Sequence, residues 1–153
     1  MLARLLTEYL LGGSLALLAS AGIVYLMTTK SVKPRDPLPA KMKSVLYKAK
    51  GEIGYSPDLM DVPKPKHGQV LIKVEAAVIH PSDTYFMRGF YNGKYTYPLT
   101  PGQEGSGTVI ASGGGFRGWT LVGKKVGFVR QAEKAGKYSI GGCYAEYCVT
   151  SAF

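Results

Sequence analysis

Cysteine is scarce in this chain, with only Cys143 and Cys148 among 153 residues. This excludes the disulfide framework of a small secreted domain. The two residues are five positions apart, and in a strand such residues point to opposite faces of the sheet. We therefore expect neither a disulfide nor a shared metal ion, and interpret both as ordinary, partly buried thiols in a reducing compartment.

Acidic residues are also few: 10 Asp and Glu stand against 19 Lys and Arg, which gives a formal net charge of +9. Such a balance is typical of nucleic-acid-binding proteins, but the chain carries no recognisable RNA- or DNA-binding motif. Many of the basic residues instead follow an apolar segment directly: Lys30, Lys33, Arg35, Lys41, Lys43, Lys48 and Lys50. This placement predicts contact with an anionic lipid surface and no nucleic-acid partner.

Charge is absent altogether from Leu10 to Met27. Extended back to Leu5, this segment would span roughly 34 Å as a helix at about 1.5 Å per residue, enough for a hydrocarbon core of about 30 Å. The sequence therefore predicts a transmembrane helix. The competing interpretations are a cleaved signal peptide with its small-residue site at 19–21, and a buried core helix.

One face of this helix carries small residues, with Gly12, Ala16 and Ser20 at every fourth position. Such a stripe allows close packing against a neighbouring helix, although a lipid-facing anchor could carry it equally well. Because the basic cluster follows the helix, the positive-inside rule places the rest of the chain on the matrix or cytosolic side. We expect a single-pass integral membrane protein and favour the mitochondrial inner membrane.

Three parts are predicted: a transmembrane helix with its flanks (1–29), a basic Pro-rich tether (30–41) and a domain (42–153). Period-two patterns in the domain predict short strands separated by glycine turns. These strands are expected at Ser44–Lys48, Leu59–Val62, Gln69–His80, Ser106–Ala111, Lys125–Val129 and Tyr144–Thr150. Pro81 to Arg88 is expected to form one or two helical turns, since proline suits the first helical position. Many short strands with little helix predict a barrel or sandwich.

Six landmarks in the domain carry a family resemblance. They read M-K-S-V-L-Y at 42–47, P-K-P-K-H-G-Q-V-L-I-K-V at 63–74, H-P-S-D-T-Y at 80–85, P-G-Q-E-G-S-G-T-V at 101–109, V-G-K-K-V at 122–126 and G-C-Y-A-E-Y at 142–147. In this order they resemble the N-terminal, GroES-like domain of the medium-chain dehydrogenase/reductase superfamily, of the quinone oxidoreductase type. The resemblance implies a mainly β fold, a partly open GroES-like β-barrel with one or two short helices.

Neither cofactor of that superfamily is expected to bind here. Its Rossmann domain is expected to be missing, because that fold needs a G-x-G-x-x-G turn between a strand and a helix, and each glycine-rich stretch here lies between two predicted strands. The glycines at 113–115 and 141–142 are interpreted as hairpin turns with no helix after them. Zinc-dependent relatives have Cys where this chain has His80 and His where it has Gln103, so no zinc is expected. His80 is expected instead to cap the helix that begins at Pro81.

Three functions fit these patterns. The first is a non-catalytic accessory or structural subunit of a membrane complex, such as a respiratory complex I-type assembly, with the bilayer and other subunits as partners. The second is the substrate-side half of an NADPH-dependent quinone oxidoreductase completed by a separate Rossmann domain, with Asp83 and Tyr85 lining the cleft and an anchor suited to a lipid-soluble quinone. Otherwise Asp83 is a helix-start carboxylate and Tyr85 a surface residue. A plain ligand- or peptide-binding barrel is the third.

The resemblance also implies an incomplete sheet. In full-length relatives, a segment that follows the Rossmann domain completes the strands of this domain. We therefore expect at least one open sheet edge here, and a further subunit that covers it.

Overall fold

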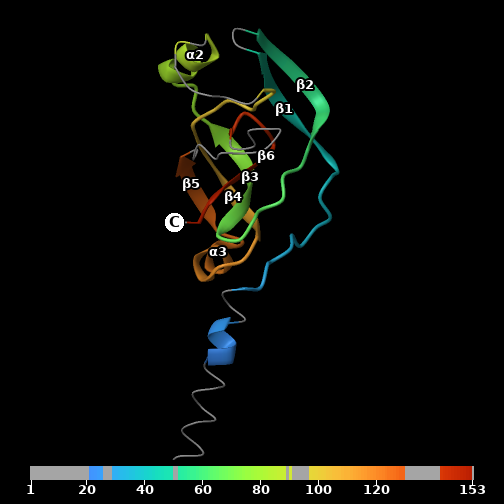
Figure 1. Ribbon diagram of the computed structural model, residues 1–153, viewed down its shortest axis with the longest axis vertical. Coiled ribbons are helices and arrows are strands. Elements are labelled where there is room, and N and C mark those ends of the chain that lie inside the picture. Colours follow the sequence, from blue (N-terminus) through green and yellow to red (C-terminus); the bar gives the residue numbers. More distant parts are fainter. Residues whose placement is uncertain are drawn as a thin grey trace, which may run out of the picture.

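The computed structural model describes residues 21–25, 29–49, 52–88, 90, 97–129 and 142–152. Its elements, in chain order, are β1 (Lys41–Ala49), β2 (Glu52–Asp61), β3 (Gln69–Ala77), α2 (Pro81–Met87), β4 (Glu104–Ser112), α3 (Phe116–Leu121), β5 (Lys125–Val129) and β6 (Tyr147–Ser151). The expected class, mainly β with one or two short helices, is confirmed (Figure 1).

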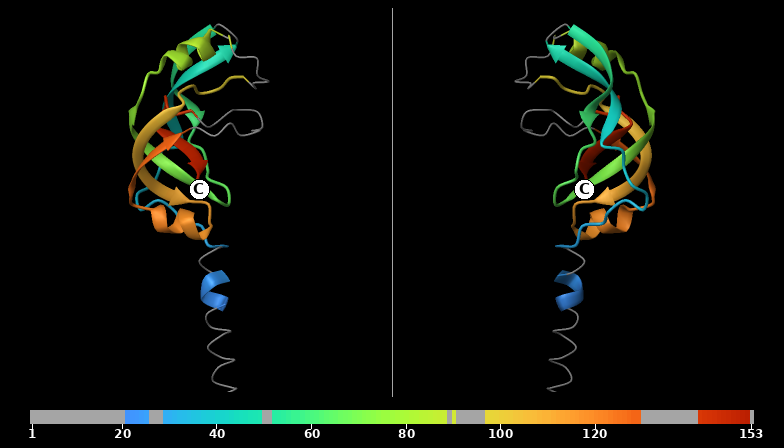
Figure 2. Two further views of the ribbon diagram at one scale, coloured as in Figure 1. Left: turned by 90° about the vertical axis from the view of Figure 1, so that its left-hand side faces the viewer. Right: turned by 90° about the vertical axis from the view of Figure 1, so that its right-hand side faces the viewer.

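All strand pairs are antiparallel and form two sheets. β1 and β2 form a two-stranded ribbon, and the larger sheet has the order β5-β4-β3-β6. β3 lies at the centre, where Ile72 is paired with Val109 of β4 on one side and Cys148 of β6 on the other. The strongly curved sheet is visible edge-on in Figure 2.

The main core fills the concave side of the larger sheet. Its fully buried members are Val70, Ile72, Val109, Cys148 and Ala152. These apolar side chains supply most of the driving force for folding, at about 25 cal/mol per Å² of apolar surface removed from water. Cys148 is therefore a core residue, and both cysteines are fully buried, more so than the partly buried thiols that the sequence predicted.

A smaller aromatic cluster connects β1 to α2. Tyr47, Phe86 and Leu99 are buried together, with Tyr97 packed against them. The ring of Tyr47 lies 5.8 Å from that of Phe86 and 5.3 Å from that of Tyr97, in tilted and edge-on arrangements that aromatic pairs prefer. This cluster fixes α2 to the β1–β2 end of the molecule.

The larger sheet is open between its two outer strands. Within the described residues, β5 pairs only with β4 and β6 only with β3. The hydroxyl of Thr150 donates to the carbonyl of Val129 at 3.5 Å, and a hollow of about 410 Å³ lies between the two strands. An open edge was expected, and among the described residues no strand ladder joins β5 to β6.

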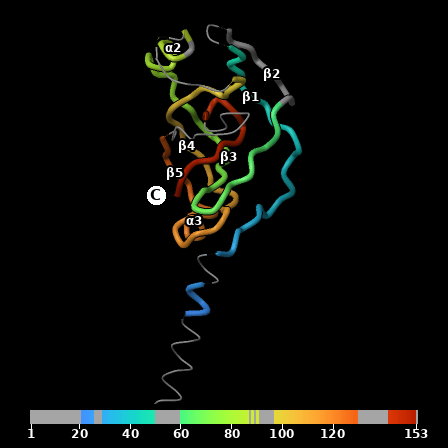
Figure 3. The backbone as a smooth tube through the Cα atoms, in the orientation of Figure 1, coloured from blue at the N-terminus to red at the C-terminus, as the bar shows by residue number. Residues whose placement is uncertain are grey.

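The segment before β1 runs along the domain, as the backbone trace shows (Figure 3). The N–H of Val32 donates to the carbonyl of Ser112 at 2.8 Å, and the N–H of Ser112 donates back at 2.9 Å. Residues 31–34 and 38–40 also line a groove together with Leu71, Ser112 and Gly113. Leu71 is buried on the convex side of the sheet, so β3 carries apolar residues on both faces.

The predicted transmembrane segment falls mostly outside the described residues, as do Gly12, Ala16 and Ser20 of the small-residue stripe. Positions 21–25 and 29 are helical. Among the residues that can be described, no helix is long and apolar enough to cross a membrane. The membrane-spanning helix stays a prediction.

Most strand boundaries differ from expectation by one to three residues, and two differences are larger. β2 begins at Glu52, seven positions before the expected start at Leu59, because β1 pairs with it as far as Glu52. The glycines at 113–115 are followed by a helix, α3, contrary to expectation. Gly118 of α3 packs so closely on β4 that a Cβ there would lie 2.5 Å from Ser112 Oγ, so tertiary contact outweighs the weak helix propensity of F-R-G-W-T-L.

Candidate functional site

The start of α2 brings polar residues together at one end of β3. His80 is the N-cap of α2, and the N–H of Ser82 donates to His80 Nδ1 at 3.2 Å. In return the N–H of His80 donates to Asp83 Oδ2 at 2.9 Å. This reciprocal pair is a capping box, with Pro81 at the first helical position. The capping role expected for His80 is confirmed.

Gln103, Ser82 and His80 form a chain of hydrogen bonds. The amide nitrogen of Gln103 donates to Ser82 Oγ at 3.3 Å, and Ser82 Oγ lies 2.8 Å from His80 Nδ1. Since Nδ1 already accepts from a backbone N–H, a neutral His80 ring carries its proton on Nε2. His80 is exposed, so this arrangement presents Nε2–H as a donor to whatever approaches.

Asp83 is the buried member of the site, with 1% of its surface exposed. Its Oδ2 accepts from the His80 N–H and lies 3.0 Å from the hydroxyl of Tyr144, which also lies 3.1 Å from the carbonyl of Val78. Burial, and then the hydrogen bond to Asp83, raise the pKa of Tyr144, so its phenol stays protonated. Asp83 Oδ1 has no hydrogen-bond partner among the described residues.

Tyr85 lies apart from Asp83, although the sequence suggested that both line one cleft. Its side chain is 55% exposed, and its ring lies 5.7 Å from that of Phe90. Residues two apart on a helix face in nearly opposite directions, so α2 directs Asp83 inward and Tyr85 outward. Both fit the structural interpretation, a helix-start carboxylate and a surface tyrosine, and their role in binding stays a prediction.

Sequence reasoning missed Ser82 and Tyr144. Ser82 connects His80 to Gln103, and Tyr144 contacts Asp83 across a separation of 61 residues. Both residues occur inside quoted landmarks, H-P-S-D-T-Y and G-C-Y-A-E-Y, and that was the available signal. Nothing local in the sequence indicates that the two landmarks meet.

The residues present do not fit a zinc ion. His80 and Gln103 lie close together through Ser82, where zinc-dependent relatives place two ligands, but an amide is a poor zinc ligand. Across the described part of the chain, no cluster of three His, Cys, Asp or Glu residues could hold a metal. The hydrogen-bond chain takes the place of a metal centre.

The glycines before α3 pack against the turn that precedes β3. A Cβ at Gly113 would overlap the carbonyl oxygen of Lys66, so this glycine is needed for close packing on the turn before β3. The N–H of Gly68 donates to the carbonyl of Gly114 at 3.1 Å and closes the same contact. These contacts hold Gly113 and Gly114 against the turn at 66–68.

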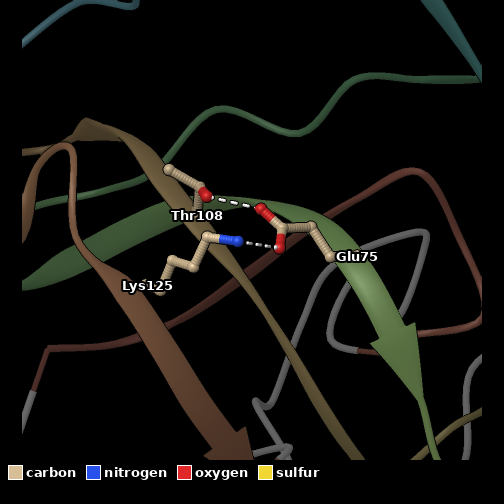
Figure 4. Close-up of polar contacts among 3 residues, drawn as sticks. All are labelled: Glu75, Thr108 and Lys125. Carbon is tan, nitrogen blue, oxygen red and sulfur yellow. Dashed lines mark hydrogen bonds and ion pairs between the residues drawn. The ribbon is translucent and has the colours of Figure 1, made fainter.

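A second polar group lies on the surface of the larger sheet (Figure 4). Thr108 Oγ1 donates to Glu75 Oε1 at 2.6 Å, and Lys125 Nζ donates to Glu75 Oε2 at 3.0 Å. These bonds, Thr108 first, lower the pKa of Glu75. The group joins β3, β4 and β5 at the surface, where the side chains of Lys125 and Glu75 are 80% and 43% exposed, and ion pairs this open to solvent contribute little.

Comparison with known proteins places these features in a family. The model of the alcohol dehydrogenase GroES-like domain matches residues 66–152. A zinc-type alcohol dehydrogenase-like protein of Schizosaccharomyces pombe is 35% identical over 100 residues, 65% of this chain and 28% of that protein. The quinone oxidoreductase of Sus scrofa is 36% identical over 91 residues, 59% of this chain and 25% of that protein.

Solved structures agree. A protein from Mesorhizobium loti, provisionally assigned as an NADPH:quinone reductase, superposes with a TM-score of 0.62 at 32% identity, over 76% of this chain and 36% of that one. The chain spans about a quarter of the length of the curated relatives it matches. With the family model covering more than half of its residues, the chain belongs to the alcohol dehydrogenase GroES-like domain family.

Proposed function

We propose that this chain forms the substrate-side half of a zinc-independent reductase of the quinone oxidoreductase type, held at a membrane by its N-terminal segment. The observation that carries the proposal is the polar site at the start of α2. There the exposed ring of His80 is oriented by Ser82 and Gln103, beside a buried Asp83 with one free oxygen. The similarity to quinone oxidoreductases supports the substrate class.

The chemistry of a quinone suits this site. A quinone offers two carbonyl oxygens that accept hydrogen bonds and gain negative charge on reduction. Donors already aimed at such an oxygen stabilise the developing charge, which is the most effective electrostatic contribution to catalysis. In this proposal His80 Nε2–H is that donor, and the Gln103–Ser82 chain holds it in place.

NADPH would supply the hydride, and we expect no phosphate-binding turn for it in this chain. We therefore expect that the chain alone neither binds NADPH measurably nor reduces quinones, and that another domain or polypeptide supplies cofactor binding. Cofactor titration of the purified chain checks this. A saturable fluorescence change at micromolar NADPH would show that the chain holds its own cofactor site.

The enzymatic proposal is tested on the chain purified in mild detergent together with the proteins that accompany it. NADPH-dependent quinone reduction is expected. His80→Ala should lower kcat/KM by about 100- to 1,000-fold, the range for a lost donor to a developing oxyanion, and Gln103→Ala should lower it in the same direction. Glu75→Gln, on the exposed surface group, is the matched control and should leave the rate unchanged. If the intact assembly reduces no quinone, the enzymatic proposal is wrong.

The open edges of β5 and β6 favour a second candidate, a non-catalytic accessory subunit of a membrane complex, with a complex I-type assembly of the mitochondrial inner membrane as the specific case. It needs no NADPH and no zinc, and its partners are the bilayer and neighbouring subunits. Purification in mild detergent with the accompanying proteins also distinguishes the enzymatic function from the accessory function. A stable complex whose own activity is unaffected by His80→Ala supports the accessory role.

A further inference from the structure

The short helix α3 exposes large aromatic side chains to solvent. Phe116 is 57% and Trp119 is 42% exposed, while Gly118 is buried against Ser112. Residues three apart on a helix are neighbours on its surface, so Phe116 and Trp119 lie on the same side. An exposed tryptophan and phenylalanine pair of this kind indicates a surface that meets something less polar than water.

Basic residues surround this aromatic pair. The turn at 66–68 packs against the glycines that precede α3, which brings Lys66 and His67 beside it. Arg117 lies on the helix, and Lys124 lies three positions after its last residue, Leu121. The three segments that meet here, 29–35, 63–68 and 113–125, contain no acidic residue. The partner that fits such a surface is both anionic and partly apolar.

The backbone places this surface next to the N-terminal helical segment. Thr29 is helical, and its hydroxyl donates to the carbonyl of Tyr25 at 2.8 Å. Three residues later Val32 is bonded to Ser112 by two backbone hydrogen bonds. The chain from Thr29 to Val32 can extend at most about 11 Å. The end of the N-terminal helical segment therefore lies close to α3. Figures 1 and 2 agree, with residues 21–25 lying beyond the α3 end of the domain.

We propose that α3 and the basic turns beside it rest on the surface of an anionic bilayer, with Phe116 and Trp119 among the lipid headgroups. The inference rests on the proposed membrane anchor, which brings this end of the domain to the bilayer. Aromatic side chains favour the interface between water and hydrocarbon, and Lys and Arg are attracted to anionic headgroups. The domain is then held at two points, by its helix and by α3, in one fixed orientation.

Trp119 provides its own probe, because it is the only tryptophan in the chain. The full chain is reconstituted into vesicles of phosphatidylcholine with phosphatidylserine, and tryptophan fluorescence is measured with lipids brominated near the headgroup or near the end of the acyl chain. We expect strong quenching by the first lipid, weaker quenching by the second, and protection from iodide in the water. High salt or vesicles of phosphatidylcholine alone should reduce the quenching by lipid.

A pair of double charge reversals tests the electrostatic part. Lys66→Glu with Lys124→Glu should release Trp119, with at least a two-fold loss of quenching by brominated lipid, while the chain still floats with the vesicles. The control pair, Lys48→Glu with Arg88→Glu, reverses two exposed charges on β1 and next to α2, away from this surface. It should leave the quenching unchanged.

The outcomes separate this inference from the anchor. If the chain floats with vesicles after alkaline extraction but iodide reaches Trp119 in every lipid mixture, α3 does not touch the bilayer and the inference is wrong, while the anchor stands. Trp119 exposed in vesicles but shielded in the native assembly would assign α3 to a protein partner and overturn the inference as well. If the unmodified chain does not float with the vesicles, both the proposed membrane anchor and the proposed contact of α3 with the bilayer are wrong.

Discussion

Asp83 is the residue on which the geometry of the α2 end depends. Its carboxylate accepts from the backbone of His80 and faces the hydroxyl of Tyr144, and so joins the start of α2 to the approach of β6. When a buried acceptor is removed, its donors lose their hydrogen-bond partners. The free energy of unfolding then falls by more than the hydrogen bonds themselves contribute.

We predict that Asp83→Ala lowers the free energy of unfolding by about 1–3 kcal/mol, and that Tyr144→Phe lowers it by about 1 kcal/mol. In the double variant the losses should be less than additive, with a coupling of about 0.5 kcal/mol or more. Asp83→Asn, which keeps an acceptor, is the milder control. Thermal and urea unfolding give these values, and strictly additive losses would show that the two side chains do not interact.

Cys148 gives the stability a pH dependence in alkali. Burial raises the pKa of this thiol from 9.0 to about 12 in the folded chain. The stability that comes from keeping the thiol protonated is therefore fully present below pH 9 and is lost as the pH rises from about 9 to 12, by up to about 1.36 kcal/mol per pH unit. Because Cys148→Ala has no thiol to ionise, its stability should fall less steeply over this range. Parallel pH profiles for the two proteins would contradict the assignment.

At this scale the sequence predicts local contacts and misses distant ones. The capping role of His80 and the helix-start position of Asp83 follow from residues within three positions of one another. The contact between Asp83 and Tyr144 spans 61 residues and depends on how the sheet curves. Sequence patterns indicate contacts between residues that are close together in the chain. An enclosed site contains residues that are far apart in the chain, so such patterns do not predict it.

Among the elements, the strands with clear alternation were the most predictable. β5 begins and ends where its pattern indicates, and β3 lies inside its expected range. β2 extends well beyond its apolar residues, because pairing with β1 stabilises a strand where the local sequence has weak strand propensity. α3 could not be anticipated, because the contact between Gly118 and Ser112 that supports it exists only in the folded domain.

The outer strands β5 and β6 should make the chain associate when no partner covers them, since free strand edges invite pairing. We predict that the purified chain forms dimers or larger species in detergent at high concentration. Val129→Lys on β5, where the side chain is 62% exposed, should shift it toward the monomer without lowering the melting temperature. Tyr85→Lys, at a side chain on α2 that is 55% exposed, is the control and should leave the association unchanged.

Sedimentation in density-matched detergent distinguishes these outcomes. A wild-type chain that stays monomeric at every concentration would show that the edges are protected, and would weaken the argument for a subunit packed on them.

For the molecule as a whole, the small-residue stripe predicts how the chain assembles. If Gly12, Ala16 and Ser20 face a neighbouring helix, Ala16→Leu should keep them from packing closely and weaken the assembly without unfolding the domain. Ala21→Leu adds the same bulk on another face and serves as the control. Native gel electrophoresis in mild detergent reads the outcome, and equal assembly of both variants would identify the stripe as a lipid-facing surface.

The course of β3 has a consequence for which molecules can be reduced. Its first residue adjoins the turn beside α3, and its last lies three positions before His80, so eight rises of about 3.3 Å separate the two ends by up to roughly 26 Å. If α3 rests on the bilayer, the α2 site looks out into the aqueous phase, well beyond the depth at which a long-tailed quinone partitions. The molecules that reach it are those that dissolve in water, so a short-chain quinone should be reduced faster than one with a full isoprenoid tail.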